Sequence, residues 1–199
     1  MADNSPMTRE IRLDKIMLAL RLKQWQKAVK LVNEDVIFYE GAATPYLDRA
    51  EFRQAIIEYG NADTQLLLAI VNITDTTTDG QQDILNVALK QTNLVKAVSP
   101  RVLERAILDC LHNDCSKTSM TDIIIALLDA GLDPNIKIKE EPLLLTALQL
   151  HNYTVVSKLL IMPELLVTEQ YLQAVNDDLS PLLRIQHSVI ERLIASRSS

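Results

Sequence analysis

The sequence predicts an all-α protein built from stacked antiparallel helix pairs, with few or no true strands. Three observations support this fold class. Apolar residues recur at helical spacing along most of the chain, as at Ile16, Met17 and Leu20. Dipeptides that end in proline, at 44–45, 99–100, 141–142 and 180–181, each precede an apolar helical run. Two segments near opposite ends of the chain also resemble each other.

This internal similarity joins residues 17–32, MLALRLKQWQKAVKLV, to residues 145–160, LTALQLHNYTVVSKLL. When the first segment is placed on the second, Ala19 falls on Ala147 and Trp25 falls on Tyr153. Similarity between helix-pair segments is typical of a repeat array, in which each pair buries its apolar face against its neighbours. We therefore expect about five stacked units.

The expected helices follow from the apolar spacing and from their start and stop signals. They cover 12–22, 25–33, 46–59, 63–72, 81–91, 100–112, 120–130, 142–150, 153–161, 167–175 and 181–196. The short runs at 42–46 and 136–139 alternate too little to predict strands. Residues 1–10 are expected to form a flexible N-terminus, 11–196 a single repeat domain, and 197–199 a flexible tail.

Residues 121–162 contain a helix, a polar turn and two further short helices. Gly131 follows the last apolar turn of the first helix, where a left-handed cap is needed, and Pro134 stops the helix. Pro142 suits the first position of the next helix. Residues 127–135, LLDAGLDPN, and 141–147, EPLLLTA, resemble the end and the opening of an ankyrin repeat. The family's opening Thr and His are Glu141 and Leu144 here, and 150–152 replace its glycine turn. The resemblance implies an ankyrin-like solenoid.

Composition excludes several classes of function. A net charge of −6 and a pI near 5.1 argue against binding nucleic acid, which requires a basic surface. No apolar run is long enough to span a bilayer, and the first residues lack the features of a secretory signal. Two cysteines without a disulfide framework fit a reducing compartment. We expect a cytoplasmic protein, or one secreted into a host cytoplasm if it is an effector.

Charge is distributed unevenly along the chain. Residues 1–32 carry seven Lys/Arg against three Asp/Glu, a net charge of +4. Residues 33–83 carry two Arg against ten Asp/Glu, a net charge of −8. The basic face of the first helix pair either keeps the array soluble or meets an acidic partner or an anionic lipid surface.

The chemistry-bearing motifs are weak. Residues 110–115, CLHNDC, bring two thiols and a histidine together, but no second Cys/His pair completes a zinc site. Residues 75–80, DTTTDG, resemble a calcium loop, but Asn86 stands where the loop requires glutamate. No known catalytic motif is present. We therefore expect no enzyme activity, no cofactor and no metal, and the alternative is a cryptic enzyme or metal-dependent factor centred on 110–115.

The sequence thus predicts a non-catalytic protein–protein interaction module. As the ankyrin resemblance implies, the partner protein is expected on the concave and loop surface of the array. The candidate contacts are residues near the turns: Tyr46, Arg49, Arg53, Lys137, Lys139, Glu140 and Asn152. Some ankyrin-like proteins are bacterial effectors that act on a host protein, and this role stays open. A monomer is expected, with self-assembly through an uncapped end as the alternative.

Overall fold

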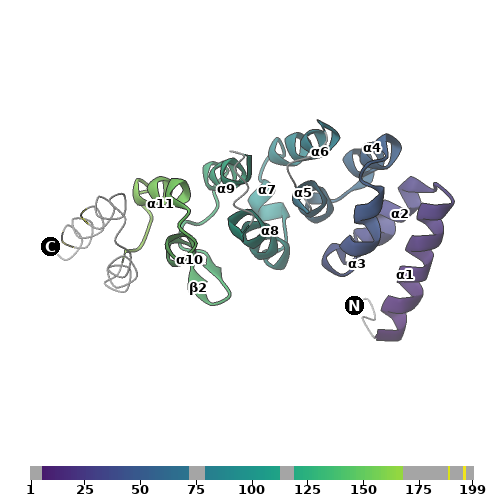
Figure 1. Ribbon diagram of the computed structural model, residues 1–199, viewed down its shortest axis with the longest axis horizontal. Coiled ribbons are helices and arrows are strands. Elements are labelled where there is room, and N and C mark those ends of the chain that lie inside the picture. Colours follow the sequence, from purple (N-terminus) through teal and green to yellow (C-terminus); the bar gives the residue numbers. More distant parts are fainter. Residues whose placement is uncertain (1–5, 72–78, 113–118, 168–187, 189–194, 196–199) are drawn as a thin grey trace. The chain divides into compact units, whose positions relative to one another are not determined.

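The computed structural model describes residues 6–71, 79–112, 119–167, 188 and 195 (Figure 1). Helices make up most of this part of the chain, and its one sheet is a two-stranded antiparallel hairpin. The all-α prediction is therefore confirmed. The chain forms two compact units, residues 1–109 and 110–199, and the single repeat domain expected over 11–196 stays a prediction. No helix in the described ranges has the length and hydrophobicity that crossing a membrane requires.

The first unit consists of helices in which alternate members contact each other. The elements are α1 (Pro6–Arg21), α2 (Trp25–Val32), α3 (Val36–Ala43), the 3-10 turn η1 (Thr44–Tyr46), α4 (Ala50–Tyr59), α5 (Ala62–Ile70), α6 (Asp79–Leu89), α7 (Leu94–Ala97) and α8 (Pro100–His112), which ends beyond this unit. Helix α1 contacts α3, which contacts α5; α2 contacts α4, which contacts α6 (Figure 1). The helices α1 to α6 therefore form three successive pairs, α1–α2, α3–α4 and α5–α6. The first helix of each pair contacts the first helix of the next, and the second helix contacts the second.

Helix α5 is the centre of the first unit's core. Every residue from Thr64 to Ile70 is buried, as the apolar run LLLAI in this helix predicts. Asn61 begins the helix, because its side-chain oxygen accepts a hydrogen bond from the Thr64 N–H at 2.8 Å.

Two loops that follow successive helix pairs are tied together by asparagine. The Asn33 side chain donates to the Tyr59 carbonyl at 2.8 Å and accepts from the Asn61 N–H at 3.1 Å. The Asn61 side chain in turn donates to the Asn33 carbonyl at 3.2 Å. These bonds satisfy backbone groups that the ends of α2 and α4 leave open, so they fix the distance between the two loops.

Apart from shifts of one or two residues at helix ends, the first unit departs from the predicted helices in four places. Helix α1 begins at Pro6 rather than at 12. Helix α3 was not predicted, because its run VIFYEGAA is apolar without helical periodicity; Asp35 starts it by accepting a hydrogen bond from the Phe38 N–H. The predicted helix 46–59 is wrong at its start, because residues 44–46 form a 3-10 turn and α4 begins only at Ala50. The short α7 was also missed.

The second unit contains α9 (Ser119–Asp129), strands β1 (Lys137–Ile138) and β2 (Glu141–Pro142), α10 (Leu143–Gln149) and α11 (Tyr153–Leu160). Gly131 has a φ of 93°, which confirms the predicted left-handed cap after α9. Lys139 and Glu140 also have positive φ values and form the tight turn between β1 and β2, whose register pairs Lys137 with Pro142. The helices predicted at 167–175 and 181–196 and the tail 197–199 lie outside the described residues, apart from Val167, Ser188 and Ala195.

The prediction that Pro142 is the first residue of a helix is wrong, because Pro142 is the N-cap of α10. The strand β2 holds Pro142 in an extended conformation with a ψ of 143°, so helical dihedrals begin only at Leu143. A second asparagine tie lies near this hairpin. The Asn135 side chain donates to the Glu164 carbonyl at 2.9 Å and accepts from the Leu166 N–H at 2.6 Å.

The similarity between 17–32 and 145–160 extends to the turn inside each helix pair. Lys23 and His151, which align with each other, have φ values of 56° and 54°. Gln24 N–H donates to the carbonyl of Ala19 at 2.8 Å, and Asn152 N–H donates to that of Ala147 at 2.9 Å. Both turns are therefore Schellman caps, and a non-glycine residue adopts the left-handed conformation in each.

Glycine substitutions give a matched prediction for the first unit. Gly41→Ala, within α3, is expected to raise the free energy of unfolding by about 0.5–1 kcal/mol, because alanine favours the helix and nothing lies within 4 Å of its Cβ. Gly60→Ala is expected to lower it by about 1–3 kcal/mol, since the new Cβ would lie 2.5 Å from the Ile56 carbonyl oxygen. Urea denaturation measures both. Equal effects of the two substitutions would contradict the packing described for Gly60.

Helix α3 carries acidic side chains that pair with arginines of α1 and α8. Arg9 lies 3.2 Å from Asp35, and Arg105 lies 3.2 Å from Glu40. Burial raises the pKa of Glu40 above its usual value of 4.5, although the charge of Arg105 acts in the opposite direction. One of its carboxylate oxygens, Oε2, is buried and has no hydrogen-bond partner among the described residues.

Glu40→Gln is therefore expected to stabilise the protein near neutral pH and to lose this advantage in acid. Because the pKa of Glu40 is raised on folding, its contribution to stability is full below 4.5 and is lost as pH rises through the raised value. The difference in free energy of unfolding between variant and wild type should then shrink as pH falls toward 4.5. Denaturation at several pH values measures this difference. The titration of the other carboxyl groups affects variant and wild type alike, so its contribution cancels. A difference that grows in acid would contradict the prediction.

Candidate functional site

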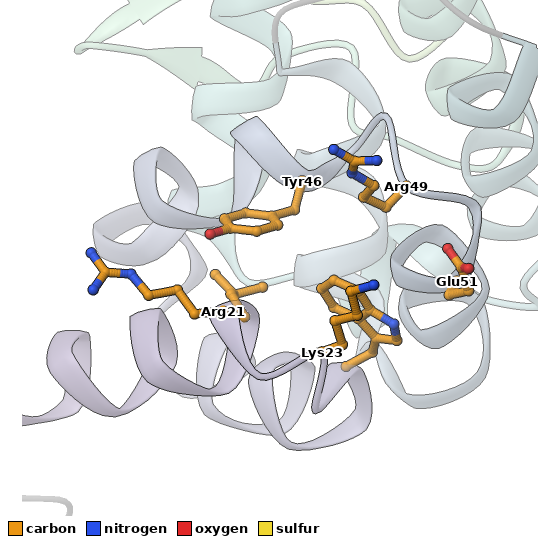
Figure 2. Close-up of a pocket in the computed structure, with 7 residues that line it drawn as sticks. Arg21, Lys23, Tyr46, Arg49 and Glu51 are labelled. Carbon is orange, nitrogen blue, oxygen red and sulfur yellow. The ribbon is translucent and has the colours of Figure 1, made fainter.

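A pocket of about 370 Å³ lies in the first unit, where the turns inside the first two helix pairs meet (Figure 2). We call it the Trp25 pocket. It is lined by residues from the end of α1, the beginning of α2, the 3-10 turn η1 and the beginning of α4: Leu20, Arg21, Lys23, Trp25, Tyr46, Arg49 and Glu51.

Aromatic side chains form one wall of the Trp25 pocket. The rings of Trp25 and Tyr46 have centroids 6.2 Å apart, and both side chains are half-buried. Behind them lies Phe52, which is fully buried, with its ring centroid 5.7 Å from that of Trp25 and 6.5 Å from that of Tyr46. Phe52 thus holds two partly exposed rings in a defined orientation, as tilted aromatic pairs favour.

Cationic side chains surround this wall. Arg21, Lys23 and Arg49 line the pocket against a single acid, Glu51. Figure 2 shows Arg21 and Arg49 on opposite sides of the view, with Tyr46 between them. The Nε atom of Arg49 lies 3.5 Å from a carboxylate oxygen of Asp48, but both side chains are well exposed, so this ion pair is weak. The pocket therefore has an excess of positive charge.

Two helices begin at the Trp25 pocket without a side-chain cap. The N-cap residues of α2 and α4 are Gln24 and Arg49, and neither makes a capping hydrogen bond through its side chain. In contrast, Asp35, Asn61 and Asn152 cap the helices that they precede. The uncapped N–H groups and the dipoles of α2 and α4 add to the positive potential of the cationic side chains.

The structure places two of the predicted contact residues, Tyr46 and Arg49, in this pocket. Arg53 is half-buried instead and donates from Nη1 to the Leu47 carbonyl at 2.9 Å, so it supports the loop before α4. Asn152 accepts a hydrogen bond from the Val155 N–H at 3.2 Å and so starts α11. The predicted contacts Lys137, Lys139 and Glu140 are exposed on the hairpin of the second unit.

Sequence reasoning missed that Arg21, Lys23, Trp25 and Glu51 belong with Tyr46. Two signals were present. Arg21 and Lys23 belong to the basic face of the first helix pair, and Trp25 is the aromatic residue that aligns with Tyr153. What joins them to Tyr46 is the contact between successive helix pairs, which sequence spacing does not specify.

The alternative centre at 110–115 lies largely outside the described residues. Cys110 is buried at the end of α8, and 113–118 are not described. The loop at 75–80 is described only from 79 onward. Within the described ranges, no group of three or more His, Cys, Asp or Glu side chains is arranged to hold a metal ion.

The lining of the Trp25 pocket consists of apolar, aromatic and charged side chains and contains no histidine, serine or cysteine. Such a lining can hold an apolar group against the aromatic rings and an anionic group against the cations. No family model matches this chain, and no curated protein or solved structure matches it either.

Proposed function

We propose that this protein is a non-catalytic protein–protein interaction module with an ankyrin-like arrangement of helix pairs, and that the Trp25 pocket is its main contact with the partner. The observation that carries this proposal is the pocket's lining, in which half-buried aromatic rings are surrounded by cationic side chains. Tryptophan, tyrosine and arginine are the residues most enriched among those that dominate binding energy at protein interfaces.

The scaffold favours the same role. The asparagine ties between loops, the matched Schellman turns and the contacts between alternate helices all restrain the turns. A restrained surface loses little conformational entropy on binding, so more of its contact energy contributes to affinity. The predicted contacts Tyr46 and Arg49 lie in the 3-10 turn η1 and at the N-cap of α4, and the Arg49 N–H donates to the Tyr46 carbonyl at 3.0 Å.

The proposal is tested by capturing partners from a cell extract with a tagged protein and with two tyrosine variants. Tyr46→Ala removes one wall of the pocket, whereas Tyr59→Ala removes a tyrosine at the end of α4 that does not line it. Proteins bound by the wild type should bind Tyr59→Ala equally and Tyr46→Ala about 30-fold more weakly, as expected for an aromatic interface residue.

Quantitative mass spectrometry measures the capture, and circular dichroism confirms that both variants are folded. Equal recovery of the same proteins by Tyr46→Ala and by the wild type would refute the proposed binding surface.

A further inference from the structure

We infer that the Trp25 pocket recognises an acidic peptide segment of the partner, in which a carboxylate side chain lies next to a large apolar one. This inference rests on the proposed function and specifies the chemistry of its partner.

The charge of the pocket selects a carboxylate. Arg21, Lys23 and Arg49 outnumber Glu51, so the lining has an excess of two positive charges, three minus one. A guanidinium group binds a carboxylate through two parallel hydrogen bonds, and the lining offers two such groups. The uncapped beginnings of α2 and α4 add positive potential at the same place.

The surroundings disfavour a more highly charged ligand. Glu51 lines the pocket and Asp48 pairs with Arg49. A phosphate dianion would therefore meet more repulsion from Glu51 and Asp48 than a single carboxylate, which carries about half its charge.

The aromatic wall and the volume specify the neighbouring side chain. Trp25 and Tyr46 expose part of their rings beside the buried Leu20, so they offer an apolar surface that a leucine-sized side chain would cover. A volume of about 370 Å³ is near the lower end for ligand sites and accommodates one or two side chains rather than a folded element. A short extended segment meets both requirements.

The test uses the intrinsic fluorescence of Trp25, which is the only tryptophan in the chain. The probe is an acetylated and amidated pentapeptide with glycine at both ends and glutamate–leucine–glutamate between them. The control peptide has glutamine in place of both glutamates. The glutamate peptide should change the fluorescence of Trp25 saturably, and the glutamine peptide should bind at least about 10-fold more weakly. Added sodium chloride should weaken binding of the glutamate peptide alone.

Charge reversals locate the effect. Arg21→Glu and Lys23→Glu should each weaken binding of the glutamate peptide on the order of 10-fold. Lys27→Glu, on the same helix as Trp25 but outside the pocket lining, makes the same change in net charge and should have little effect. Thermal unfolding of each variant shows whether it is folded. If the left-handed turn at Lys23 does not tolerate glutamate, Arg21→Glu alone decides the result.

Three results would overturn the inference. If the two peptides bind equally, the site recognises only the apolar side chain. If inorganic phosphate binds more tightly than the glutamate peptide, the site is one for phosphate. If neither peptide binds, the pocket does not recognise such a peptide. None of these refutes the proposed function, which is decided separately by the capture experiment with Tyr46→Ala and Tyr59→Ala.

Discussion

Phe52→Ala is expected to lower the free energy of unfolding of the first unit by about 3–5 kcal/mol, as removal of a buried phenylalanine ring does. Phe52 is fully buried in α4, and its ring contacts those of Trp25 and Tyr46. Alanine would leave a cavity behind both rings that the surrounding helices cannot fill without moving α2 toward α4, which contact each other.

The chain provides its own control, because it contains only two phenylalanines. Phe38 is 44% exposed on α3, and its ring lies 5.0 Å from the guanidinium carbon of Arg9. Phe38→Ala should therefore cost only about 0.5–1 kcal/mol. Urea denaturation followed by the fluorescence of Trp25 measures both variants, and similar losses for the two would contradict the assignment of Phe52 to the core.

Phe52→Ala should also weaken ligand binding, although Phe52 does not line the pocket. Without the ring behind them, Trp25 and Tyr46 gain rotamer freedom that binding must remove again. The emission maximum of Trp25 should shift to longer wavelength as water reaches its ring. The shift would show that Phe52→Ala weakens binding by releasing the rings of Trp25 and Tyr46, and not by removing a contact between Phe52 and the ligand.

The helical class and most helix positions followed from apolar spacing. The helix expected at 100–112 matches α8, and those expected at 25–33 and 153–161 differ from α2 and α11 by a single residue at one end. Amphipathic helices of this kind carry their signal in their own sequence, because the buried face must recur with the helical period. Gly131 was similarly predictable, since few other residues tolerate a φ of 93°.

Helix α3 and the Trp25 pocket were not predictable in the same way. Residues 36–39 are Val, Ile, Phe and Tyr, which local propensity assigns more readily to a strand. Contacts with α1 and α5 on either side override that propensity. The pocket depends on the same kind of information, since Lys23 and Arg49 belong to different helix pairs and meet only because α2 packs against α4.

The short β1–β2 hairpin shows a third limit of sequence reasoning. Residues 136–139 alternate too little to predict a strand, and β1 and β2 are only two residues each. The turn requires positive φ at Lys139 and Glu140, neither of which is a residue typical of that conformation. Its formation therefore depends on packing in the second unit, where Ile138 and Leu143 are buried.

Asp35→Ala is the substitution outside the core with the largest expected effect, a loss of about 2–3 kcal/mol in the free energy of unfolding. Asp35 caps α3 through the Phe38 N–H, lies 3.2 Å from Arg9, and lies 3.9 Å from Arg101. Its side chain is only 14% exposed, so alanine would remove the cap and leave Arg9, whose Nε is buried without a hydrogen-bond partner among the described residues, without its carboxylate.

Asp35→Asn separates the two contributions of this side chain. Asparagine keeps an oxygen that can cap α3 but loses the negative charge, so its cost measures the pairing with the arginines, and the further cost of Asp35→Ala measures the cap. We expect Asp35→Asn to cost about 1 kcal/mol and to be less sensitive to salt than the wild type. Equal stability of Asp35→Ala and the wild type in urea denaturation would mean that α3 is held by its packing against α1 and α5 alone. In that case, the arginines of α1 and α8 would not contribute to the position of α3.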